Sequence, residues 1–457
     1  MIDTDLTFCQ SELIEVINLF GKDAENLNIR HRTTEKEGKL VNTVTVSGRV
    51  YAYGNLVKAF KDEIERKRLV KRYAKLSVYK ALSTHLNKQA PWGALTGIRP
   101  TKLAYQQIEE TGEFEDFFTS TMKVSAEKTL LTKDVLDAQK GIYVKDDDNC
   151  DFFVFIPFCP SRCKYCSFIS ADINVAKKYV DDYVDALIEE INYSAKYVKN
   201  LRSIYIGGGT PVCLPDDKLE RVLCALDKIN TGVEFTVEAG RPDAITESNL
   251  KILKKHGVTR ICLNPQTFQD KTLVSLGRSH TAQDILDKYE LCAKDFSVNM
   301  DLIAGLEGET FEDFKDTLDK TISLNPDNIT VHTLSVKRGS TLAEKVSRLD
   351  DGQTEKMVEY SYKVLKEKGY VPYYLYRQKY MSANLENVGY TKPNKACVYN
   401  VDVMEEIAQN IACGSNAISK KVIDGGRVIH REASPKDIPT YLNKLPQILQ
   451  SKDKLFE

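Results

Sequence analysis

The chain has 457 residues, of which 42% are hydrophobic and 28% are charged, and its formal net charge is −1. This composition is ordinary for a globular enzyme of several domains. The balanced charge excludes a polybasic nucleic-acid-binding protein. No apolar run approaches the roughly 20 residues that span a bilayer. The N-terminal sequence MIDTDL lacks a basic and apolar signal pattern, so we expect a cytoplasmic protein with no nucleic-acid partner and no membrane span.

Residues 1–145 mix strand-like and helical sequence, and we expect an N-terminal α+β domain whose role the sequence does not assign. The stretch LVNTVTVSGRVYAYG is strand-like, and apolar residues at helical spacing predict a helix over about 56–86. That helix is rich in lysine and arginine. Its basic side is either a solvated face of a packed helix or a positive surface near the mouth of an active site. A second helix is expected to begin near Pro100, and the acidic stretch KDDDNC is typical of a linker.

Residues 150–345 alternate short apolar runs with amphipathic segments, which is typical of parallel strands covered by helices. The predicted strands are 152–156, 203–206, 233–238, 259–263, 298–303 and 329–334. The predicted helices are 179–198, 216–228, 247–257, 282–292 and 311–324. Six such strands form an α/β fold, a partial (β/α)6 TIM-like barrel, in which functional residues lie just past the C-terminal ends of the strands.

Residues 346–457 are expected to form a C-terminal α/β extension that covers a substrate. A helix is predicted over 353–368, and a tyrosine-rich stretch and the motif ACGSNAISK follow it. The tyrosines either line a pocket for a substrate of aromatic size or pack at domain seams.

Three cysteines, Cys159, Cys163 and Cys166, lie in FIPFCPSRCKYCSF with C-x3-C-x2-C spacing. Iron–sulfur clusters usually have four cysteine ligands, so a loop that offers three leaves one iron open to a ligand that is not protein. A structural zinc site would require a closed shell of four ligands, and no partner pair or histidine is close in sequence. A disulfide is disfavoured in a reducing compartment.

The other eight cysteines are scattered singly along the chain, which makes an odd total of 11. We expect them to be small core hydrophobes. They are Cys9, Cys150, Cys213, Cys224, Cys262, Cys292, Cys397 and Cys413.

Polar or glycine residues recur where the predicted strands end. The motif GGGTP follows the second strand, and glycine allows backbone to approach a ligand closely. Glu238, in FTVEAGRPD, can accept hydrogen bonds, and Arg278 can bind a carboxylate through two hydrogen bonds. The further candidates are Gln266 in NPQTF, Asp301 in MDLIAG and His332 in VHTL.

Together these features resemble the radical S-adenosylmethionine (SAM) superfamily: the cysteine spacing with an aromatic residue before the last cysteine, GGGTP, and the Glu, Gln, Arg and Asp positions. More narrowly, the chain resembles the oxygen-independent coproporphyrinogen III dehydrogenase (HemN-like) family. The sequences WGALTGIRPTKL, VEAGRPD and NPQTF are similar to its HemZ-type branch. The core resemblance covers about residues 150–345.

The resemblance implies a cofactor set and a role for each matching residue. Cys159, Cys163 and Cys166 would bind a [4Fe–4S] cluster whose open iron binds the amino and carboxylate groups of S-adenosyl-L-methionine. Phe153 stands where the family often has tyrosine, and Tyr165 would pack beside the adenine. The remaining positions would contact one or two SAM molecules, and they are Gly208, Gly209, Thr210, Glu238, Gln266, Arg278, Asp301 and His332.

The reaction that the resemblance implies is an oxidoreductase step of haem biosynthesis under anaerobic conditions. An electron from a flavodoxin or ferredoxin-type donor would generate a 5′-deoxyadenosyl radical, and coproporphyrinogen III would lose two carboxyl groups to give protoporphyrinogen IX. Arg99, Arg338 or the basic stretch 66–80 would bind the propionates of this tetrapyrrole.

One position departs from the family pattern. Phe168 stands where well-established dehydrogenases carry a further cysteine, and haem-chaperone relatives also have phenylalanine there. Three functions therefore stay open: a dehydrogenase, a haem chaperone, and a radical SAM methyltransferase or other tetrapyrrole-modifying enzyme. The long N-terminal region argues against the chaperone.

Overall fold

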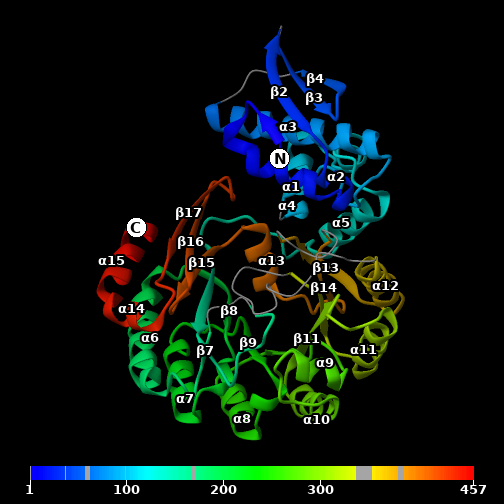
Figure 1. The fold of residues 1–457 in the computed structure, drawn as a ribbon. Coiled ribbons are helices and arrows are strands. Elements are labelled where there is room, and N and C mark those ends of the chain that lie inside the picture. The colour runs from blue at the N-terminus through cyan, green and yellow to red at the C-terminus, as the bar shows by residue number, and fades with distance from the viewer. Residues whose placement is uncertain are drawn as a thin grey trace. The chain divides into compact units, whose positions relative to one another are not determined.

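The computed structural model describes residues 2–36, 38–56, 62–97, 99–166, 170–335, 352–378 and 385–457. Phe168 and Arg338 lie outside the described residues. The chain forms two compact units, Met1–Lys133 and Asp134–Glu457. The second unit contains the predicted barrel segment together with residues 346–457 (Figure 1). Within the described residues, no helix combines the length and the apolar character needed to cross a membrane.

The first unit contains a four-stranded sheet in the order β1-β2-β3-β4. These strands are β1 (Ile2–Thr4), β2 (Ile29–Lys36), β3 (Lys39–Val46) and β4 (Arg49–Leu56). β1 pairs with β2 in parallel, and the other pairs are antiparallel. The stretch LVNTVTVSGRVYAYG forms the hairpin β3–β4, since Ser47 (φ 46°) and Gly48 (φ 87°) both adopt the positive φ of a tight hairpin turn.

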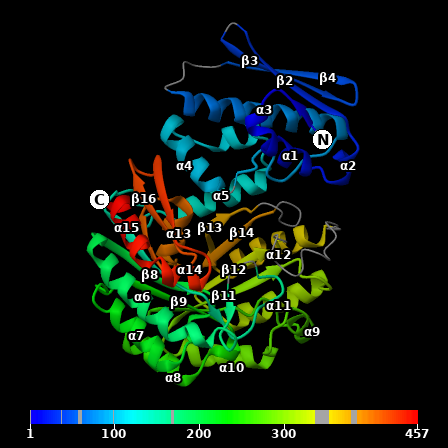
Figure 2. The same ribbon diagram turned by 60° about the vertical axis from the view of Figure 1, so that its left-hand side comes forward.

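The helix α3 (Glu63–Leu86) lies along one face of this sheet and packs on β3 (Figure 2). It begins at Asp62, whose side chain accepts a hydrogen bond from the backbone N–H of Glu65, and it ends at Asn87 in the left-handed conformation. The other α-helices are α1 (Gln10–Asn18), α2 (Lys22–Glu25), α4 (Pro100–Thr111) and α5 (Ala126–Ala138), whose last residues follow the boundary at Lys133. α4 begins at the predicted proline.

The second unit contains an eleven-stranded sheet in the order β13-β14-β12-β11-β10-β9-β8-β5-β15-β16-β17. Its centre consists of the six predicted strands, which all pair in parallel. They are β5 (Asn149–Ile156), β8 (Asn200–Gly208), β9 (Glu234–Gly240), β10 (Arg260–Leu263), β11 (Ser297–Ala304) and β12 (Asn328–Thr333). The predicted α/β barrel is therefore confirmed.

Helices cover the outer face of these strands (Figure 1). They are α6 (Val180–Ser194), α7 (Asp216–Leu226), α8 (Glu247–Lys255), α10 (Ala282–Ala293) and α11 (Phe311–Leu324), and the short α9 (Asp270–Ser275) was not predicted. α8, α10 and α11 each begin with a threonine capping box, which satisfies free backbone N–H groups. Alternate strand residues, such as Ile204 and Ile206 of β8, pack against the helices, so their neighbours face the barrel interior.

Residues of the C-terminal region extend both edges of the barrel sheet. β13 (Val371–Tyr376) and β14 (Asn387–Thr391) add antiparallel strands beside β12. β15 (Gln409–Cys413) pairs in parallel with β5, and β16 (Ile418–Ile423) and β17 (Val428–Ala433) follow it. The helices here are α12 (Gln353–Glu367), α13 (Val398–Glu405), α14 (Ile438–Asn443) and α15 (Leu445–Phe456).

The segment 395–405, which includes α13, lies across the N-terminal ends of the barrel strands. Asn328 Nδ2, at the start of β12, donates to Lys395 O at 2.9 Å. Arg202 Nε, near the start of β8, donates to Asp402 Oδ2 at 2.6 Å. Because this end is closed by protein, the C-terminal ends of the strands are the place for a ligand site.

Candidate active site

The cysteine loop leaves the C-terminal end of β5 and is anchored at its base by backbone hydrogen bonds. The short strand β6 (Phe158–Cys159) pairs with β7 (Ala171–Asp172). The N–H groups of Gly209 and Thr210 donate to Ile156 O and Phe158 O, both at 2.7 Å. The glycine turn after β8 thus holds the start of the loop.

Glycine is required in this turn because protein backbone approaches it closely. A Cβ atom on Gly209 would lie 2.9 Å from Ile156 O and nearer still to Phe158 O. Gly208 has φ 103°, and its Cβ would meet the ring of Phe155 at 2.7 Å. The backbone N–H groups of Gly209 and Thr210 are used within the protein, whereas the Thr210 hydroxyl donates to Cys159 Sγ at 3.6 Å. The predicted contact of this turn with SAM stays a prediction.

Arg241, directly after β9, contacts the tip of the cysteine loop. Its Nη1 donates to Ser161 Oγ at 2.6 Å and to Cys163 Sγ at 3.9 Å. Asp243 holds the same guanidinium through two hydrogen bonds of 2.9 and 2.7 Å. Arg241, which belongs to the motif GRPD, was not predicted as a site residue. The signal was present, since a strand end followed by Arg-x-Asp predicts an oriented guanidinium.

Arg278 and Tyr165, both predicted site residues, bind each other. Arg278 Nη2 donates to Tyr165 Oη at 2.8 Å, and Nη1 donates to Asn264 O at 2.6 Å. The backbone N–H of Lys164 donates to Leu276 O at 3.0 Å, so the loop is joined to the segment before Arg278. The predicted binding of a carboxylate by Arg278 is not tested by these contacts.

Polar and charged groups beside the loop offset part of the cost of burying anionic sulfur. Burial raises the pKa of the Cys159 thiol, while the Thr210 hydroxyl and the Arg241 charge act in the opposite direction. Two buried guanidinium groups, those of Arg241 and Arg278, lie beside the loop. The positive charge of these two groups would partly offset the negative charge of thiolates bound to iron.

Glu238, at the end of β9, accepts a hydrogen bond from Tyr205 Oη at 2.6 Å. Removal from water raises the pKa of Glu238 to about 7, and the nearby Asp301 charge adds to the increase. A carboxyl group with this pKa can hold or release a proton near neutral pH. Tyr205 was not predicted as a site residue.

Asp301 and His332 also come together at the strand ends. His332 Nε2 lies 3.5 Å from Asp301 Oδ2, and Asn299 Nδ2 donates to Asp301 Oδ1 at 2.7 Å. Burial alone would raise the pKa of Asp301, but His332 and Asn299 outweigh it and lower the pKa. Tyr376 Oη lies 3.3 Å from His332 Nδ1, so one residue of the tyrosine-rich stretch reaches the site.

Phe153 lies inside the barrel, where it stacks with Tyr205 (ring centroids 6.1 Å apart) and Tyr399 of α13 (5.9 Å). This aromatic layer lies next to Glu238, because Tyr205 Oη donates a hydrogen bond to the Glu238 carboxylate. Tyr374 also packs inside the barrel, with its Oη 3.2 Å from Thr330 Oγ1. Tyr370, Tyr373 and Tyr390 are buried as well, so most tyrosines of the stretch that the structure describes are packed residues.

Several polar atoms at the strand ends are buried without a hydrogen-bond partner among the described residues. They include Gln266 Oε1 and Arg278 Nε. Gln266 has φ 69°, and its backbone bonds to both Asp301 O and Ile303 N, which fixes the side chain at the strand ends. Because buried polar groups are normally satisfied, these atoms and the three thiols fit a polar ligand beside a cluster.

Comparison with known proteins agrees with this geometry. Residues 153–321 match the family model of the radical SAM superfamily. A HemZ protein of Bacillus subtilis (strain 168), described as oxygen-independent coproporphyrinogen-III oxidase-like, is 34% identical over 440 residues, which are 91% of this chain and 88% of that protein. The heme chaperone HemW of Lactococcus lactis subsp. lactis (strain IL1403) is 32% identical over 48% of this chain and 60% of its own.

Among solved structures, HemN from Escherichia coli, titled a coproporphyrinogen III oxidase and radical SAM enzyme, aligns with a TM-score of 0.53. The alignment has 21% identity and covers 71% of this chain and 73% of HemN, so it shows a shared fold. The fold and the cysteine loop define a protein of the radical SAM class. Within that class, the chain belongs to the HemN- and HemZ-like family of coproporphyrinogen oxidase-like proteins.

Proposed function

We propose that this protein catalyses the oxygen-independent oxidative decarboxylation of coproporphyrinogen III to protoporphyrinogen IX. The observation that carries the proposal is the extent of the match to HemZ, which includes the N-terminal unit as well as the barrel. The raised pKa of Glu238 and the unpartnered atoms at the strand ends are consistent with an active site.

Three residues would hold the cluster and the strand ends would hold SAM. Cys159, Cys163 and Cys166 would bind three irons of a [4Fe–4S] cluster, because they offer three thiols on one anchored loop. Gln266, Glu238 and Asp301 supply oxygen acceptors for the amine and ribose hydroxyls of one or two SAM molecules. When both are bound, the cluster and SAM together would supply a carbon radical that can abstract hydrogen from an unactivated carbon.

The protein's own residues would position these groups and control protons. Arg241 and Thr210 would donate hydrogen bonds to the cysteine sulfurs that bind the cluster, and Arg278 would hold the loop in place through Tyr165. His332 Nε2 lies 3.5 Å from the Asp301 carboxylate at the strand ends. Residues 346–457, which extend both sheet edges, are proposed to cover the tetrapyrrole. Arg99 and the stretch 66–80 belong to the first unit and stay candidates for binding propionates.

A haem chaperone is the second candidate. The matches to heme chaperones, at 32% identity for HemW of Lactococcus lactis, favour it. Those matches cover much less of the chain than the HemZ match does, so we rank the chaperone below the dehydrogenase. For either function we propose a cytoplasmic protein, and for the dehydrogenase a reduced flavodoxin or ferredoxin-type electron donor.

One anaerobic assay separates these functions. The cluster is reconstituted, reductant, SAM and coproporphyrinogen III are added, and products are followed by mass spectrometry. Loss of two carboxyl groups supports the dehydrogenase. Tight haem binding without turnover supports the chaperone, and 5′-deoxyadenosine with intact coproporphyrinogen III contradicts the proposed substrate.

Matched cysteine variants test the cluster assignment. Cys163→Ala should lose the brown absorbance and the turnover, because one iron loses its thiolate. Cys292→Ala, at a buried cysteine of α10 outside the loop, should keep both. Brown absorbance retained in Cys163→Ala would contradict the assignment.

A further inference from the structure

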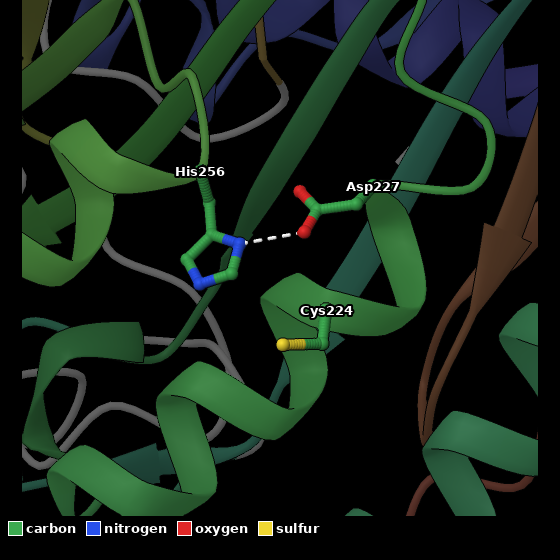
Figure 3. Close-up of side chains that lie close together, drawn as sticks. All are labelled: Cys224, Asp227 and His256. Atoms are coloured by element: carbon green, nitrogen blue, oxygen red, sulfur yellow. Dashed lines mark hydrogen bonds and ion pairs between the residues drawn. The ribbon is translucent and has the colours of Figure 1, made fainter.

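Cys224, Asp227 and His256 form a second cluster of potential metal ligands, on the outer helical layer (Figure 3). Cys224 lies on the last turn of α7, Asp227 directly follows α7, and His256 directly follows α8. One ligand atom from each side chain lies within 4.8 Å of the others. Cys224 is exposed, so the expectation that it is a core hydrophobe is wrong, because its side of α7 faces away from the sheet.

The imidazole of His256 is fixed in place between two carboxylates. Its Nδ1 lies 2.8 Å from Asp227 Oδ2, and its Nε2 lies 3.8 Å from Glu220 Oε1. The side chain is only 3% exposed, and Nε2 is buried without a hydrogen-bond partner among the described residues. In Figure 3 the Cys224 side chain points toward the space beside the ring.

We propose that Cys224 Sγ, His256 Nδ1 and an Asp227 carboxylate oxygen bind a divalent transition-metal ion of the zinc type. Thiolate, imidazole and carboxylate are ligands that zinc accepts together, with water in the fourth position. Tetrahedral bonds of about 2.0–2.3 Å place ligand atoms roughly 3.5 Å apart. The His256 Nδ1–Asp227 Oδ2 separation of 2.8 Å must therefore lengthen slightly. Rotation of the exposed Cys224 side chain can adjust the position of its Sγ, which lies within 4.8 Å of the other two ligand atoms.

Glu220 is placed to orient the His256 ring without binding the metal itself. With the metal on Nδ1, the Nε2–H of His256 faces the Glu220 carboxylate, and such partners orient metal-binding histidines. Lys255 opposes the metal through its positive charge, but its Nζ already binds Glu220. Two further cations lie near Cys224: Lys228 donates to Asn192 Oδ1 at 2.7 Å, and Arg221 donates to Asp185 Oδ1 at 2.5 Å.

The cluster is separate from the candidate active site. His256 lies four residues before β10 begins at Arg260, so the cluster lies near the N-terminal ends of the strands, whereas the cysteine loop leaves the C-terminal end of β5. A bound ion would link α7 to α8. We therefore expect it to stabilise the helical layer without taking part in the radical reaction.

The test uses the full-length protein with its cluster reconstituted, so that iron fills the cysteine loop. After weakly bound metal is removed with a chelator, the protein is titrated with Zn²⁺, and zinc-edge X-ray absorption reports the ligands of zinc alone. We expect one zinc per chain with one sulfur ligand and nitrogen or oxygen ligands. Several sulfur ligands, or no retained zinc, would overturn the proposal.

Variants identify the ligands. Cys224→Ser and His256→Gln should each weaken zinc binding by about tenfold or more, whereas Asp217→Asn, at an exposed carboxylate of α7, should not. Lys255→Met should tighten binding, because it removes a repelling charge. Zinc should raise the melting temperature of the unaltered protein but not of Cys224→Ser. If Cys224→Ser and His256→Gln both bound zinc as tightly as the unaltered protein does, the assignment of these ligands would be wrong.

Discussion

Arg241 Nη1 donates a hydrogen bond to Ser161 Oγ at 2.6 Å, which joins the end of β9 to the tip of the cysteine loop. Because the same guanidinium reaches Cys163 Sγ and is fixed by Asp243, it is a residue that positions the loop. Arg241 thus anchors the tip of the loop, while Arg278 and the backbone carbonyl of Leu276 hold it near Tyr165 and Lys164.

Arg241→Gln should lower the affinity of the loop for the cluster by about tenfold or more, which is typical for loss of a partner outside the ligand shell. Iron content after anaerobic reconstitution at limiting iron measures this. Arg221→Gln removes an exposed arginine paired with Asp185 and serves as the control. Unchanged iron content in Arg241→Gln would mean that the loop is held without it.

Gly209→Ala should destabilise the barrel by about 1–3 kcal/mol, since the added methyl group overlaps backbone at the base of the cysteine loop. The loop must shift, so cluster content should fall as well. Urea unfolding and iron analysis measure the two effects. Gly54→Ala is a suitable control, because its Cβ would meet no atom within 4 Å. Normal stability of Gly209→Ala would show that the turn can relax freely.

Glu238→Gln should change how stability depends on pH. The pKa of Glu238 is about 7 in the folded protein, above its ordinary 4.5, so the folded state binds the proton more tightly than the unfolded state. Tighter proton binding by the folded state contributes to the free energy of unfolding. This contribution is complete below about pH 4.5 and is lost as the pH rises through about 7.

The Gln variant should therefore gain stability relative to the unaltered protein over that pH range. Melting temperatures measured from pH 5 to 8 test the prediction, with the exposed Glu247→Gln as control. A difference that stays constant with pH would contradict the raised pKa.

Lys452→Met should destabilise the second unit by about 3–5 kcal/mol, because it leaves the buried Glu190 carboxylate without its cation. Lys452 Nζ lies 2.9 Å from Glu190 Oε1, and Glu190 Oε2 accepts from the Gly414 N–H at 2.8 Å. The pair thus holds the ACGSN motif at the end of β15. Unfolding in urea measures the loss.

Two further variants show whether that loss comes from the buried charge. The double variant Lys452→Met with Glu190→Gln should lose less stability than Lys452→Met alone, because neither charge remains. Lys196→Met, which breaks an exposed pair with Asp453, should lose about 1 kcal/mol or less. If all three variants lost the same free energy of unfolding, the loss in Lys452→Met could not be assigned to the unpaired charge of Glu190.

The sequence by itself determined the central fold and much of the candidate site. Alternating apolar runs and amphipathic segments located all six parallel strands, because strand and helix periodicity are local properties of sequence. The parallel arrangement then brought Glu238, Asp301 and His332 to one end, as predicted. The cysteine spacing located the loop, since its ligands lie within one short segment.

Only the tertiary structure decided the contacts between distant segments. Periodicity cannot show that β15 pairs with β5, that segment 395–405 closes the other end of the barrel, or that Tyr205 bonds to Glu238. It also could not separate the exposed Cys224 from the buried cysteines, or show that Arg241 reaches the loop. These relationships depend on which faces meet after packing, and residues up to hundreds of positions apart establish them.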